Sequence, residues 1–132
     1  MKQLICRCDS GKPFEHCCKP FLNGDAKPKT AKQLMRSRFS AYALGGCGNY
    51  LLGTWHPLNR QGLNAGELSL RQVNWQGLEI IDSDQQGDKG VVEFKATYVD
   101  NEGETFVHHE LSTFLREKGF WYYVGELQKH SS

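Results

Sequence analysis

The sequence lacks long hydrophobic runs and any strong excess of one charge. No stretch of about 18 consecutive apolar residues occurs, so no transmembrane helix is expected. The first residues contain no apolar segment of signal-peptide length. The chain has 16 Lys and Arg against 15 Asp and Glu, and a formal net charge of +1 argues against a duplex DNA binder that relies on a basic field. We therefore expect a cytoplasmic protein, in which cysteines stay reduced and favour metal binding over disulfides.

The chain does have enough apolar material for one globular domain. Its 132 residues are too few for two ordinary domains but allow one domain with a small appendage. Hydrophobic residues make up 39% of the chain and aromatic residues 11%, which suffices to build a core.

Four of the five cysteines are concentrated near the start of the chain. Cys6 and Cys8 form a C-x-C pair, and the adjacent Cys17 and Cys18 follow residues 9–16, a loop rich in turn-forming residues. Such a loop can fold the second pair back on the first, and four thiolates supply the tetrahedral ligand set that Zn²⁺ prefers. Disulfides are the alternative, but adjacent cysteines do not pair easily and a reducing compartment opposes them. The cluster therefore predicts one structural zinc ion.

The same residues resemble a known zinc motif. The segment 6–18, CRCDSGKPFEHCC, is similar to the SEC-C motif, the zinc module at the C-terminal end of the SecA translocation ATPase, which also occurs on many small proteins. The resemblance implies contact with a protein or ribosomal partner and the zinc ligands Cys6, Cys8, Cys17 and Cys18. Two positions depart from the motif, since Asp9 stands where glycine is usual and Cys18 where SecA has histidine. His16 is the rival ligand, because its ring could replace Cys17 or Cys18.

Downstream of the cysteines the pattern changes from helical to extended. The capping-box signature of residues 30–33 predicts a helix that ends at the glycines of residues 45–46, and a second short helix is expected over 49–55. Residues 67–74 are expected to add one or two helical turns. Four strands joined by tight turns, and therefore antiparallel, are expected over residues 78–84, 90–100, 104–117 and 120–127. Helices followed by such a sheet indicate an α+β fold.

Three blocks of this region resemble one family of small bacterial proteins. Residues 34–42 (LMRSRFSAY), 54–57 (TWHP) and 121–124 (WYYV) look like the YchJ family, in the same order along the chain. The resemblance implies a nuclear-transport-factor-2-like (cystatin-like) cone, in which a curved antiparallel sheet wraps around helices, but no settled activity. Many cones of this kind dimerise through the sheet, so a homodimer is one expected assembly. The implied organisation is a SEC-C motif at 1–22, a linker at 23–29 and the cone domain at 30–128.

A cone of this kind often encloses a pocket. The candidates to line it are Arg36, His56, Glu93, His108 and Glu110. His108 and Glu110 are two residues apart in a predicted strand and share a face, so the carboxylate could orient the imidazole for proton transfer. The alternative is a polar pair on a solvated face. His109 is expected to face the opposite way.

Two arginines and one histidine complete the candidate pocket. Arg36 and Arg38 lie about 200° apart around the predicted helix, so both cannot point inward. One of them is expected to be buried against a carboxylate such as Glu93 or Glu110. His56 follows the second predicted helix, either at a pocket mouth or as packing at the helix end.

These observations favour a non-catalytic zinc-containing interaction or binding protein. The alternative is a small enzyme or small-ligand binder that uses the pocket of the cone. No catalytic residue is assigned, because no pattern places a nucleophile or substrate group near the histidines, and enzyme activity is not favoured. Nucleic-acid binding is also less favoured, since it rests on Arg7, Lys12, Lys19, Lys27 and Lys29 alone.

Overall fold

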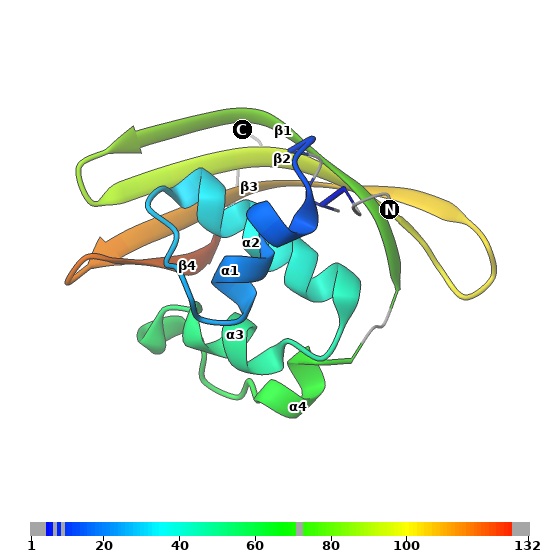
Figure 1. Ribbon diagram of the computed structural model, residues 1–132, viewed down its shortest axis with the longest axis horizontal. Helices are drawn as coiled ribbons and strands as arrows, with labels where there is room; N and C mark the ends of the chain where they lie inside the picture. Colours follow the sequence, from blue (N-terminus) through cyan, green and yellow to red (C-terminus); the bar gives the residue numbers. More distant parts are fainter. Residues whose placement is uncertain (1–4, 7, 9, 71–72, 128–132) are drawn as a thin grey trace, which may run out of the picture.

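The computed structural model describes residues 5–6, 8, 10–70 and 73–127. A four-stranded antiparallel sheet curves around helix α2 (Ala31–Leu44), and the shorter helices lie on the same side of the sheet (Figure 1). The α+β fold predicted from the sequence is therefore confirmed. Arg7 and Asp9, and the ends of the predicted organisation at residues 1 and 128, lie outside the described residues.

Helix α2 begins and ends where its sequence predicts. Thr30 is the N-cap, and its hydroxyl oxygen accepts a hydrogen bond from the backbone N–H of Gln33 at 3.0 Å. The side-chain oxygen of Gln33 accepts from the N–H of Lys29, at 2.8 Å, one residue before the cap. At the other end, Gly45 has a φ of 75°, a left-handed conformation that glycine adopts without steric cost and that stops the helix.

The remaining helices are short. They are α1 (Lys19–Leu22), α3 (Gly48–Gly53) and α4 (Ala65–Leu68), with 3₁₀ turns at Phe14–His16 and Pro57–Asn59. The helical turns predicted over residues 67–74 lie earlier in the structure, because the Asn64 side chain caps α4 by accepting from the N–H of Glu67 at 2.8 Å. The helix ends at Leu68, and Asn74 already belongs to the first strand. In the described ranges, no helix combines the length and the hydrophobicity required of a membrane-spanning segment.

The sheet contains its strands in the order of the sequence. They are β1 (Asn74–Gln86), β2 (Lys89–Val99), β3 (Thr105–Glu117) and β4 (Phe120–Glu126). Neighbouring strands are antiparallel, as predicted. β1 is longer than the strand expected over 78–84, because its pairing with β2 extends past both ends of that range, from Asn74 opposite Val99 to Gln86 opposite Lys89. Register shifts in the β1–β2 and β3–β4 pairs add the local bend that curves the sheet.

The core lies between α2 and the concave face of the sheet. Val92, Phe94 and Ala96 alternate along β2 and are buried there, as the period of two in the sequence predicts. Leu34 and Phe39 of α2 pack in the same cluster. This packing holds α2 across the sheet with one face toward the strands.

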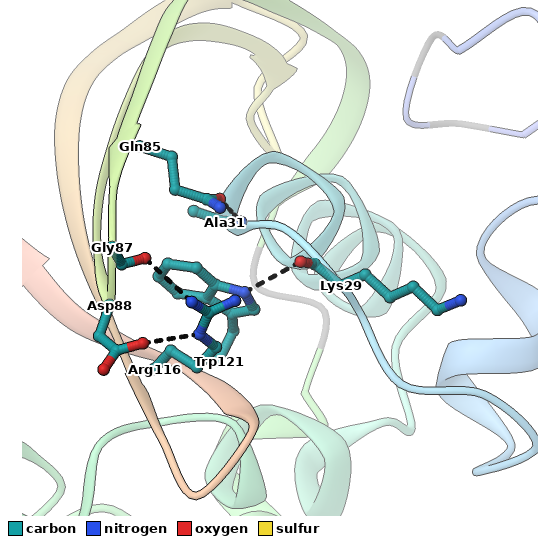
Figure 2. Close-up of polar contacts among 7 residues, drawn as sticks. All are labelled: Lys29, Ala31, Gln85, Gly87, Asp88, Arg116 and Trp121. Atoms are coloured by element: carbon teal, nitrogen blue, oxygen red, sulfur yellow. Dashed lines mark hydrogen bonds and ion pairs between the residues drawn. The ribbon is translucent and has the colours of Figure 1, made fainter.

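The segment predicted as a linker, residues 23–29, ends against one end of the sheet (Figure 2). The indole N–H of Trp121 donates to the backbone oxygen of Lys29 at 3.1 Å. The guanidinium carbon of Arg116 lies 5.2 Å from the centre of the Trp121 ring, and Arg116 pairs with Asp88 at 2.8 Å. These interactions fix the chain between the cysteine cluster and α2.

Candidate metal centre and ligand cavity

The cysteine cluster is built by a tight hairpin and two short helical turns. Ile5 forms an antiparallel bridge with Pro13, which closes the hairpin that carries the first pair of cysteines. Cys17 directly follows the first 3₁₀ turn, and Cys18 is the N-cap of α1. The loop of turn-forming residues therefore brings the second pair back onto the first.

The sulfur atoms of Cys6, Cys8, Cys17 and Cys18 form a group suited to one metal ion. All four lie within 4.8 Å of one another, with Sγ–Sγ distances of 3.5 Å for Cys8–Cys17 and 3.9 Å for Cys17–Cys18. Zn–S bonds of about 2.3 Å place tetrahedral sulfurs about 3.8 Å apart, so this spacing fits zinc. Four protein ligands leave no open position, which is typical of a structural site. Among the described residues His16 is exposed and is not in this group.

Hydrogen bonds among the thiols shift the pKa values of Cys8 and Cys18 in opposite directions. Hydrogen bonds from Cys18 and Cys6 hold the pKa of the Cys8 thiol well below its ordinary value, whereas its hydrogen bond to Cys6 raises the pKa of Cys18. Burial raises the pKa of Cys17 to about 11. A metal ion bound by these sulfurs would displace the remaining protons, because thiolates are the ligands.

The cysteine cluster shares the core of the rest of the chain. Cys6, Cys8 and Cys18 are buried and pack in the same hydrophobic cluster as α2. The Sγ of Cys6 lies 3.4 Å from the hydroxyl oxygen of Ser40, and the Arg36 guanidinium donates to the backbone oxygen of Cys8. A metal ion held here would therefore fix the N-terminal segment on α2.

A cavity of about 560 Å³ lies between α2, α4 and the concave face of the sheet. Its aromatic lining residues are Phe39, Tyr42, Trp55, Trp75, Phe94, Tyr98 and Tyr123. Alternate residues of β3 add polar groups to the wall, namely His108, Glu110 and Ser112. An apolar cavity of this size with a few convergent polar groups has the usual form of a small-molecule site.

The Glu110 carboxylate is the centre of these polar groups. The Glu110 side chain is 13% exposed, and it accepts hydrogen bonds from the hydroxyl of Tyr123, at 3.0 Å, and from the hydroxyl of Ser112. The Nε2 atom of His108 lies 2.9 Å from the other carboxylate oxygen. Alternation along β3 and the pairing of β4 with β3 bring the groups together.

Arg38 lies in the α2 wall of the cavity with its guanidinium enclosed. The residue is 3% exposed, and it donates to the Leu51 carbonyl at 2.8 Å and to the Thr54 hydroxyl at 2.7 Å. Its guanidinium carbon lies 4.9 Å from the centre of the Trp55 ring and 4.7 Å from that of Tyr123. Burial lowers the pKa of Arg38, but an arginine stays charged at neutral pH.

Two tyrosines of the cavity keep their protons at neutral pH. Burial, with a further contribution from the nearby Glu110 carboxylate, raises the pKa of Tyr123 above its ordinary value. Burial also raises the pKa of Tyr42. Tyr123 therefore remains a hydrogen-bond donor to Glu110.

The structure brings two of the five predicted pocket residues to the cavity, His108 and Glu110. Glu93 lies elsewhere, on the convex face of the sheet, where its carboxylate lies 2.7 Å from Nε2 of His109. The reason is the alternation of β2, which points Phe94 into the core and its neighbour outward.

His56 and Arg36 are also separate from the cavity. His56 is buried, but its Nε2 lies 2.7 Å from the Glu117 carboxylate. The backbone N–H of His56 donates to the backbone oxygen of Tyr123 in β4 at 2.8 Å. Arg36 binds the backbone of the cysteine cluster, whereas Arg38 is the arginine that reaches the cavity. The sequence predicted Arg36 for the pocket, whereas the structure places Arg38 there, against a carbonyl, a hydroxyl and two rings and not against the expected carboxylate.

Sequence reasoning missed Ser112, Tyr123 and Tyr42 as cavity residues. Ser112 continues the alternation of His108 and Glu110, so the period of two was a usable signal. Tyr123 entered the sequence analysis only within the block 121–124, and its approach to Glu110 follows from the β3–β4 register.

Comparison with known proteins identifies the family. A family model described as YchJ, middle NTF2-like domain, matches residues 30–126. The chain belongs to the YchJ family. Within it, a UPF0225 protein of Chromobacterium violaceum is 45% identical over 131 residues, covering 95% of this chain and 93% of the relative. A UPF0225 protein of Serratia proteamaculans is 41% identical over 125 residues, covering 91% of this chain and 80% of the relative.

A solved structure similar to this YchJ-family chain is described as a protein that contains a SEC-C motif. The solution structure of a SEC-C motif containing protein from Rhodopseudomonas palustris has a TM-score of 0.87 and 30% sequence identity, and the match covers 96% of this chain and 99% of that one. The predicted family and the nuclear-transport-factor-2-like fold are thus confirmed.

Proposed function

We propose that this YchJ-family chain is a small-ligand-binding protein whose fold is stabilised by one structural Zn²⁺ ion. The observation that carries the proposal is the aromatic cavity with the Glu110 carboxylate in its wall. Burying a carboxylate costs free energy unless it is compensated, so its place in an apolar cavity supports a role in recognising a ligand. The proposal assigns recognition, and no reaction, to these groups.

The binding test uses a neutral fluorescent apolar probe, N-phenyl-naphthylamine, titrated into the metal-loaded protein. Saturable binding of one probe per chain is expected in the wild type. Ala96→Trp should abolish it, because Ala96 is buried and lines the cavity, so the larger ring fills the space. Lys95→Trp is the matched control, since Lys95 is the exposed neighbour on the other face of β2. Equal binding by both variants would contradict the proposal.

The identity of the metal is the second part of the proposal. Tetrahedral all-sulfur sites select zinc or iron–sulfur chemistry, and four cysteines around one ion favour zinc. Native mass spectrometry of the purified protein should show one zinc per chain. Cys17→Ser should lose it, whereas Cys47→Ser should keep it, because Cys47 lies outside the cluster. A metal-free protein with a folded N-terminus would contradict this part.

We also propose that the outer surface of the cysteine cluster contacts a protein or ribosomal partner in the reducing cytoplasm. The observation in favour is a set of exposed side chains beside the cluster, in which Lys12, His16 and Lys19 outnumber the acidic Glu15 and give this surface a basic character. Affinity capture should recover fewer partners with the double variant Lys12→Glu, Lys19→Glu than with Lys95→Glu on the convex face of the sheet. Identical partner sets would contradict this role.

A further inference from the structure

We infer that the ligand of the cavity is an organic ammonium compound, an apolar body with a cationic amine that meets Glu110. The inference rests on the proposed function, since it names the class of ligand that the same cavity binds. Three features of the cavity support the inference: the Glu110 carboxylate has no permanent cation beside it, Arg38 is bonded to other groups, and the walls are aromatic with a net negative charge.

The Glu110 carboxylate lacks a permanent cation beside it. Two of its donors are neutral hydroxyls, those of Ser112 and Tyr123, and the third is the imidazole of His108 at the exposed rim. A carboxylate offers about four lone-pair positions, and three donors leave room for one more. Buried charges in proteins are normally paired, so a cationic ligand would supply the missing partner.

Arg38 is not the cationic partner of Glu110. In the part of the chain that the structure describes, no ion pair joins Arg38 to Glu110, and the guanidinium bonds instead to the Leu51 carbonyl and the Thr54 hydroxyl. The rings of Trp55 and Tyr123 lie beside it. Two of its five N–H donors, both on Nη1, are therefore held by the protein, its charge lies against two aromatic rings, and it leaves Glu110 without a paired cation.

The charge and composition of the walls also favour a cation. The charged lining residues are one cation, Arg38, and two anions, Glu67 and Glu110, which leaves the cavity with one net negative charge when His108 is neutral. Aromatic rings attract cations through the negative potential of their faces, and quaternary or alkylated ammonium groups are recognised in this way. A cavity of about 560 Å³ accommodates an apolar body behind such a group.

The test compares three compounds that share one apolar body and differ in the head group: para-tert-butylbenzylamine, para-tert-butylbenzyl alcohol and para-tert-butylbenzoate. Calorimetric titration of the metal-loaded protein near neutral pH should show the amine, then an ammonium ion, binding about tenfold more tightly than the alcohol, with the carboxylate weakest. Equal affinity of amine and alcohol, or tightest binding of the carboxylate, would overturn the inference. This comparison needs only the wild-type protein.

Variants assign the preference to Glu110. Glu110→Gln should remove the preference for the amine over the alcohol, because the amide keeps the size of the side chain and removes its charge. Glu93→Gln, on the convex face, should keep the preference. A preference that survives in Glu110→Gln would overturn the assignment. If the neutral probe binds but the amine shows no advantage, only this inference fails, and if no compound binds, the proposed function fails with it.

Discussion

At the scale of the residue, Arg38 connects α2 to α3, to the C-cap of α3 and to β4. Lysine cannot reproduce its planar set of donors, so Arg38→Lys should leave the Leu51 carbonyl or the Thr54 hydroxyl without its partner. We expect a loss of about 2 kcal/mol in the free energy of unfolding, measured by urea denaturation. Arg116→Lys is the control and should cost less than about 1 kcal/mol, because its ion pair with Asp88 is exposed. Equal losses in the two variants would contradict this role.

Tyr50 makes stability depend on pH in the alkaline range. Burial raises its pKa from 10.0 to about 12, and its hydroxyl lies 2.6 Å from that of Ser37. The folded state therefore holds the phenol proton more tightly than the unfolded state does. The resulting stability is complete below pH 10 and is lost as the pH rises toward 12.

Urea denaturation across this pH range should show the free energy of unfolding falling in the wild type. The fall should be shallower in Tyr50→Phe, which has one less phenol to titrate, while Tyr42 and Tyr123 still contribute because burial raises their pKa values as well. Parallel curves for wild type and variant would contradict the assignment to Tyr50.

At the scale of the element, the N-terminus of α2 approaches β2 at a glycine. A Cβ atom on Gly90 would lie 2.6 Å from the Cβ of Ala31 and 3.4 Å from the Trp121 ring. Gly90→Ala should therefore destabilise the protein by about 1–3 kcal/mol through overpacking, measured by thermal or urea unfolding. Adding Ala31→Gly should restore part of the loss by removing the clashing methyl group.

The matched control for the contact between α2 and Gly90 is Gly53→Ala at the end of α3, where a Cβ atom would meet nothing within 4 Å. That variant should be neutral, or more stable by up to about 1 kcal/mol because alanine favours the helix. A Gly90→Ala protein as stable as Gly53→Ala would show that α2 and β2 do not pack as described.

The elements that the sequence predicted well are those with local signals. The cap at Thr30, the stop at Gly45 and the alternation of β2 act within a few residues, so α2 and the strands were predictable. The start of α4 and the full length of β1 were not. The start of α4 depends on a single cap, Asn64, and the start of β1 depends on pairing with the far end of β2, where Asn74 lies opposite Val99.

At the scale of the whole molecule, the cysteine cluster and the α+β domain share one core. Removing the metal should therefore destabilise the entire chain and not only its first residues. Scanning calorimetry before and after treatment with a chelator should show a loss of at least about 3 kcal/mol, or roughly 10 °C in the unfolding temperature, with recovery on adding zinc. An unchanged main transition would indicate an independent N-terminal module.

The cavity is the feature that the sequence predicted least. Strand alternation placed His108 and Glu110 on one face, but the enclosure of that face depends on where α2 and α4 pack on the sheet. The same packing determines that Arg38 lines the cavity while Arg36 binds the cysteine cluster. Such distant contacts leave no periodic signal in the sequence.

The most direct measurement of ligand binding in the cavity is the change in backbone amide NMR shifts when the neutral probe is added to the zinc-loaded protein. Binding in the cavity should shift the amides of residues on its inner walls, such as Phe39, Ala96 and Ser112, far more than those of Lys95 and His109 on their exposed positions. Saturation should occur at one probe per chain. Shifts confined to the convex face of the sheet, or no saturable shifts at all, would contradict a ligand-binding cavity.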